Sequence, residues 1–167
     1  MRPFRRTRDG TLRARFEPDE AEILARLAAE TAELAVDAAS GAGDPREDPA
    51  FIRLLPDAYS GDAEASAEFR RFTAGGLAER KALTAQVVME TLGGGSGAIE
   101  VRLDAPQAAA WLRTLTDIRL VLAARLGIVQ DGDEGDIHDA DSAFRRAVYD
   151  WLAGVQESLV LALRSTR

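Results

Sequence analysis

Apolar residues recur at helical spacing along most of this chain, and the clearest pattern runs from Asp104 to Gly127. Its apolar positions are Trp111, Leu115, Ile118 and Leu122, widened by Leu112, Ala123 and Leu126. Asp104 suits the N-cap, with Gln107 where a capping-box partner belongs, and Gly127 suits the end of a helix. We therefore predict a central helix here, whose apolar stripe forms the floor for a sheet and for the last helix.

The same periodicity predicts further helices on both sides of the central one. They run from Glu17 to about Ser40-Gly41, over one or two turns at Ala50–Leu55, from Asp62 or Ser66 to Leu92, and from Ala140 to Leu163. Gly75-Gly76 is expected to bend or break the third of these. Predicted buried positions are Ile23, Leu24, Leu27, Thr31, Leu34 and Ala38 in the first helix, Leu54, Leu55 and Tyr59 around the second, and Phe144, Val148, Trp151, Leu152, Val155, Leu159 and Leu163 in the last.

Residues 3–8 and 11–16 read as a β-hairpin, and 98–103 alternate as a third strand. A two-residue turn at Asp9-Gly10 would pair Arg8 with Thr11, whereas a three-residue turn would pair Thr7 with Thr11. We prefer the three-residue turn, with Gly10 left-handed, because it gathers the apolar side chains on one face. That face holds Phe4, Leu12, Ala14 and Phe16, and the opposite face holds Arg5, Arg13 and Arg15.

These elements predict an α+β fold that is mainly α. About four to five helices would form a bundle with a small three-stranded antiparallel sheet, built from the hairpin and strand 98–103. The 167 residues, 46% of them hydrophobic, suit one domain over 1–167. No apolar run is long enough to cross a bilayer, and no apolar segment follows the basic N-terminus as in a secretory signal. We expect a cytoplasmic protein without membrane contact.

Charge is distributed unevenly along the chain. Residues 1–16 hold six arginines and one aspartate, a local charge of +5, so the remaining residues carry −12 of the overall −7. The basic hairpin could meet a nucleic acid or an acidic protein. The acidity of the rest disfavours general nucleic-acid binding, which needs many cations facing phosphates. There are no cysteines, which excludes disulfides and thiolate chemistry, and Lys81 is the only lysine.

No motif for catalysis, metal or cofactor binding is present. His138 is the only histidine, and the acidic residues around it at 131–141 do not fit the spacing of a calcium loop. The glycines at 93–97 lack the lysine and hydroxyl residue of a phosphate-binding loop. We expect no cofactor, no metal and no enzymatic activity. An enzyme with an unrecognised carboxylate site is the least favoured alternative.

The arginine side of the hairpin is the best candidate for function. Arg5, Arg13 and Arg15 would project together and contact a partner, more readily a protein than DNA. The structural alternative pairs them with Glu17, Asp19 or Glu100 of this chain. Two other contacts stay open. The segment LLPDAY (54–59) could anchor a partner instead of the core, and the broad apolar face of the last helix could be buried in a homodimer or inside the monomer.

Three stretches together resemble the actinobacterial domain-of-unknown-function family DUF2017, which includes an oxidative-stress regulator. They are the basic hairpin, LLPDAY, and WLRTLTDIRLVLAARLGI followed by a last helix with YDWL. The resemblance implies a cytoplasmic regulatory or adaptor protein that acts through protein contacts in a transcriptional stress response. A DNA-binding regulator that uses the hairpin is the alternative. The family's redox-sensing form has a cysteine pair near its N-terminus, which this chain lacks, so that switch does not transfer.

Overall fold

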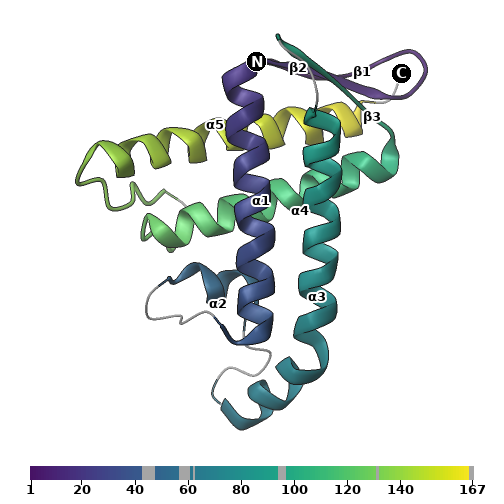
Figure 1. The fold of residues 1–167 in the computed structure, drawn as a ribbon. Coiled ribbons are helices and arrows are strands. Elements are labelled where there is room, and N and C mark those ends of the chain that lie inside the picture. The colour runs from purple at the N-terminus through teal and green to yellow at the C-terminus, as the bar shows by residue number, and fades with distance from the viewer. Residues whose placement is uncertain (43–47, 57–60, 62, 94–96, 131, 166–167) are drawn as a thin grey trace.

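The structure is a computed structural model that describes residues 1–42, 48–56, 61, 63–93, 97–130 and 132–165 (Figure 1). In chain order the elements are β1 (Arg2–Arg6), β2 (Leu12–Phe16), α1 (Pro18–Ser40), α2 (Ala50–Leu54), α3 (Ala63–Leu92), β3 (Ile99–Leu103), α4 (Ala105–Arg125) and α5 (Ala140–Arg164). The predicted class, α+β and mainly α with a three-stranded antiparallel sheet, is confirmed. The segment 57–60, with Tyr59, lies outside the described residues, while Leu54 and Leu55 are buried as expected.

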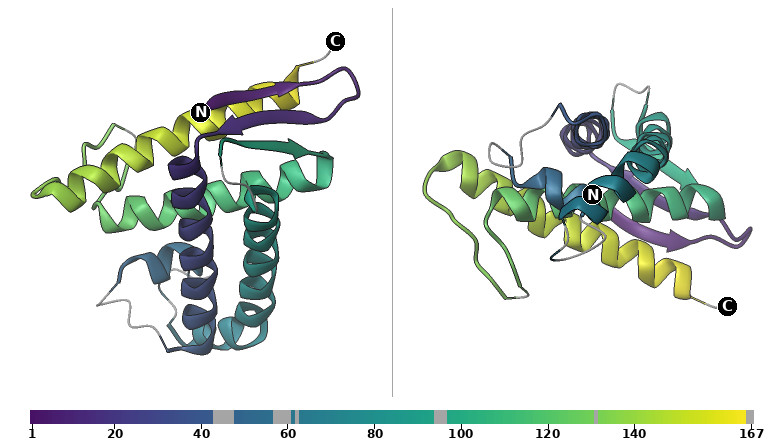
Figure 2. Two further views of the ribbon diagram at one scale, coloured as in Figure 1. Left: turned by 45° about the horizontal axis from the view of Figure 1, so that its top comes forward. Right: turned by 90° about the horizontal axis from the view of Figure 1, so that it is seen from below.

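Helix α4 lies in the middle of the molecule. Helices α1 and α3 run side by side across one side of it, and α5 follows its other side (Figure 2). Both ends of α4 have the capping residues that the sequence predicts. Asp104 Oδ1 accepts a hydrogen bond from the Gln107 amide at 2.8 Å, and Gln107 Oε1 accepts one from the Asp104 amide at 3.0 Å. Gly127 continues from the helix with a φ of 67°, which favours glycine.

The sheet has the order β1-β2-β3, and both pairs are antiparallel. The Thr7 amide donates to the Thr11 carbonyl oxygen at 2.9 Å, and Gly10 has a φ of 87°. The three-residue turn and its register are therefore confirmed. One feature was not predicted: Arg5 pairs with Arg13 but Arg2 pairs with Arg15, so β1 contains a bulge with one extra residue between those pairs.

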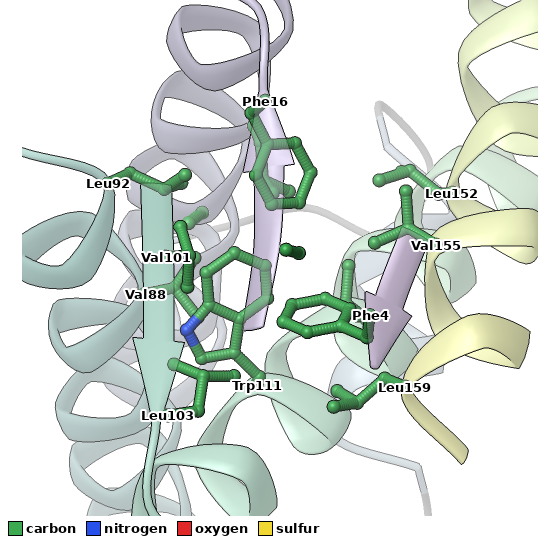
Figure 3. Packing of buried hydrophobic residues seen from close by; sticks show 14 of the residues in the cluster. Phe4, Phe16, Val88, Leu92, Val101, Leu103, Trp111, Leu152, Val155 and Leu159 are labelled. Atoms are coloured by element: carbon green, nitrogen blue, oxygen red, sulfur yellow. The ribbon is translucent and has the colours of Figure 1, made fainter. Parts of the chain in front are cut away.

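The inner face of the sheet packs on the central helix, as predicted. Trp111 points from α4 between β3 and β1, and side chains of α5 close the far side (Figure 3). Its indole ring lies 5.5 Å from the Phe4 ring and 5.7 Å from the Phe16 ring, and its Nε1 donates to Thr91 Oγ1 at 2.9 Å. Leu115, Ile118 and Leu122 continue the buried stripe, at 0%, 0% and 3% exposure.

The buried face of α1 differs from the prediction. Leu24 and Thr31 are buried as expected, but their companions on the contact line are the alanines Ala21, Ala28 and Ala35. Ile23, Leu27, Leu34 and Ala38 are only half-buried. Alanines at heptad spacing let two helix backbones approach closely. Helix α3 also has buried alanines, at positions 74, 78 and 85, so the larger α1 side chains flank this contact line.

Helix α3 continues through Gly75-Gly76 without a break, and its N-terminal part bends away from the axis of the rest, so of the two predicted alternatives the structure has the bend (Figure 1). One expectation for α5 is corrected. Phe144 is 54% exposed rather than buried, because α5 packs on α4 and the sheet along one side only. The residues that make this contact are Val148, Leu152, Val155, Leu159 and Ala162, while Trp151 and Leu163 are half-buried.

Because Leu115 is fully buried under the sheet, the variant Leu115→Asp should unfold the protein. Burying an unpaired carboxylate and losing the apolar contacts should lower the free energy of unfolding by more than about 4 kcal/mol. Leu83→Asp is the matched control, because Leu83 is 56% exposed and should tolerate the charge. Thermal unfolding followed by circular dichroism measures both. A normally folded Leu115→Asp protein would contradict the architecture described above.

Candidate functional site

The outer face of the sheet gathers the predicted site residues. Arg5, Arg13 and Arg15 are exposed and lie together, because Phe4, Leu12, Ala14 and Phe16 take the inner positions of the same strands. Two arginines that the prediction did not include join them. Arg2 lies opposite Arg15, and Arg102 of β3 lies opposite Arg13. We call Arg2, Arg5, Arg13, Arg15 and Arg102 the arginine face.

One carboxylate lies within the arginine face. Glu100 Oε1 accepts a bond from Arg13 Nη2 at 2.6 Å and another from Arg102 Nε at 3.1 Å. These two bonds lower the pKa of the Glu100 carboxyl. Of the acids considered as internal partners, Glu100 is therefore used, whereas Glu17 takes part in the capping of α1. Within the described part of the chain, no carboxylate forms an ion pair with Arg2, Arg5 or Arg15.

Register sets both opposite and like charges across from one another on this face, because Arg15 lies opposite Glu100 while other arginines lie opposite arginines. Arg5 faces Arg13 directly across β1 and β2, and Arg2 faces Arg15 in the same way. Like charges directly opposite each other destabilise a sheet. A hollow of about 620 Å³ lies over these side chains, bordered also by Glu100 and Thr7. The face is suited to accept carboxylates or other anions, which would relieve the repulsion.

Two acidic residues of the segment before α5 have structural roles. Asp133 Oδ2 accepts from the amides of Val129 and Gln130, and Asp139 caps α5 through Ser142. His138 is exposed. Across the described ranges, no three His, Cys, Asp or Glu side chains are grouped so that they could hold a metal ion. Of the helices in those ranges, none combines the length and apolar character required to span a bilayer.

A buried ion pair that the sequence did not predict joins α3 and α4. Lys81 of α3 and Asp117 of α4 form an ion pair at 2.6 Å, with side chains only 16% and 10% exposed. Two signals could have found it: Lys81 is the only lysine, and Asp117 falls between the apolar positions Leu115 and Ile118 of the central helix. The pair lies at the floor of a groove of about 460 Å³ between α3 and α4.

The geometry thus defines a mainly helical protein with a cationic sheet face. The chain belongs to the domain of unknown function family DUF2017, whose model matches residues 1–163. The proteins named oxidative stress regulator AosR from Mycobacterium tuberculosis and Mycobacterium bovis are 30% identical to it over 190 residues, which cover 96% of this chain and 86% of theirs. A putative oxidative stress regulator AosR from Mycobacterium leprae is 32% identical over 133 residues, covering 72% and 60%. No solved structure matches.

The Glu100 pairing makes a direct prediction about titration. In the native protein the pKa of Glu100 should lie below its usual range, because Arg13 and Arg102 stabilise the charged form. Arg13→Ala should raise that pKa toward the ordinary value, while Arg26→Ala on α1 should leave it unchanged. Carboxyl chemical shifts followed by NMR against pH measure this. A Glu100 pKa that does not respond to Arg13→Ala would contradict the pairing.

The buried pair makes a prediction about stability. Asp117→Ala leaves the Lys81 ammonium largely buried without its partner, and should lower the free energy of unfolding by about 2–4 kcal/mol. Replacing both partners with apolar residues, Lys81→Met with Asp117→Leu, should restore stability to within about 1 kcal/mol of the original. Urea unfolding of the single and double variants measures the difference. If the single and the double variant lose equal free energy of unfolding, the Lys81–Asp117 ion pair is not what stabilises this part of the protein.

Proposed function

We propose that this protein is a regulatory protein that acts by binding an acidic surface of a protein partner through the arginine face. The observation that carries the proposal is the gathering of five arginines on one exposed sheet face with a single glutamate among them. The relatives' names, which describe oxidative stress regulators, support a regulatory role.

Two features favour a protein over DNA. The first is charge: outside residues 1–16 the chain carries −12, which would repel a phosphate backbone approaching from most directions. The second is the ion pairing of Glu100 within the arginine face. Glu100 already shows how a carboxylate fits between Arg13 and Arg102, with both bonds on one oxygen. An acidic side chain of a partner would find equivalent donors at Arg2, Arg5 and Arg15.

The proposal includes no catalytic step and no cofactor, and it places the protein in the cytoplasm. A regulator of this kind changes the activity of its partner by occupying the partner's surface. It does so without a thiol switch, because the chain contains no cysteine.

Self-association through α5 is a further part of the proposal, supported by the exposed side chains of Phe144 and Leu161 on that helix, which are 54% and 57% exposed. Light scattering across a range of concentrations tests it.

Charge reversal tests the arginine face. Arg13→Glu with Arg15→Glu should weaken partner binding at least about tenfold, because two favourable charge pairs become repulsive. A tagged chain is used to capture partners from native cell extract, and the affinity for a recovered partner is then measured with purified proteins. Arg26→Glu with Arg53→Glu is the matched control, since both residues are exposed and lie away from the sheet.

A third variant sharpens the result. Glu100→Gln removes the internal competitor for Arg13 and Arg102, so it should tighten partner binding a few-fold. If the doubly reversed protein folds and keeps every partner, the arginine face is not the interface. If purified protein instead binds duplex DNA, with affinity that falls steeply with salt and is lost in the doubly reversed variant, the face is a nucleic-acid interface.

A further inference from the structure

The groove between α3 and α4 lies apart from the arginine face and is lined by both apolar and cationic side chains. Leu77 of α3 and Leu112 of α4 are half-buried in its walls, and Arg80 and Arg113 stand exposed beside them. Next to the groove, the outer side of α3 exposes two large apolar side chains, Phe72 at 82% and Leu83 at 56%. Arg80 and Leu83 are three residues apart, so they lie on neighbouring positions of the α3 surface.

The cations on the rim have no partners in the described ranges of the chain. No carboxylate there forms an ion pair with Arg80 or Arg113. The charge at the floor is already neutralised, because Lys81 and Asp117 pair with each other at 2.6 Å. The groove therefore has a net charge of two positive units from its rim arginines. An apolar side chain can cover the floor without leaving an unpaired charge beneath it.

We propose that this groove is a second docking site, and that its occupant is an acidic amphipathic helix of a protein partner. Helices bind in grooves between two helices by inserting apolar side chains at positions spaced by three and four residues. Leu77 and Leu112 supply the apolar contacts for such a stripe. Arg80 and Arg113 then meet carboxylates on its flanks, a complementarity that a basic or neutral helix lacks.

The probe is a labelled synthetic helix of about 18 residues, or roughly five turns. Leucines form one stripe, and glutamates fill most other positions. Its control carries lysines in place of the glutamates. All measurements use the full chain with Arg13→Glu and Arg15→Glu, so that the arginine face binds the acidic probe more weakly. A result at the groove is thus separated from the success or failure of the proposed function.

Binding is followed by fluorescence anisotropy and by backbone NMR shifts of isotope-labelled protein. The acidic helix should bind and shift resonances in 77–84 and 112–117, and the lysine helix should not bind. Adding Arg80→Glu with Arg113→Glu should weaken binding at least about tenfold, and Leu77→Glu should weaken it several-fold. The matched control, Arg26→Glu with Arg53→Glu in the same background, should leave binding unchanged.

Three outcomes would overturn the proposal. The first is an unchanged affinity after reversal of Arg80 and Arg113, with the fold intact by circular dichroism. The second is a set of shifts outside the groove. The third is self-association of the chain that Leu77→Glu abolishes, which would make a second copy the occupant of the groove.

Discussion

The contact of Trp111 with Phe4 and Phe16 holds the sheet against the central helix α4. The indole belongs to the central helix, and the two phenyl rings belong to different strands of the sheet, so the contact fixes the sheet on α4. The bond from the indole nitrogen to Thr91 ties the end of α3 to the same point. The arginine face depends on this contact, because the outward arginines alternate with the inward phenylalanines that Trp111 positions.

Alternation and capping made much of the fold predictable. Phe4, Leu12, Ala14 and Phe16 could be placed on one face because a strand has a period of two, and Asp104 with Gln107 marked a helix start through local bonds. The face of α1 was not predictable by hydrophobicity. Helix packing there depends on how closely two backbones approach, which favours Ala28 and Ala35 over the larger Leu27 and Leu34.

The candidate site was predicted in part for a similar reason. Arg5, Arg13 and Arg15 follow from the hairpin register alone, but Arg102 requires knowing which strand β3 joins and in what register. Lys81 and Asp117 are 36 residues apart and meet only through the crossing of α3 and α4. No local pattern encodes that crossing. Charged residues whose partners come from distant elements are thus the ones that sequence periodicity misses.

The bulge in β1 has a consequence for how this family can vary. Without the extra residue, Pro3 would oppose Arg15, and Arg2 would point to the same side as Phe4, into the core. The outward position of Arg2 is therefore set by the number of backbone residues before the turn. A relative that loses one residue from this strand would have to bury a guanidinium group or give up that arginine. Strand length and arginine content at the N-terminus should consequently change together among relatives.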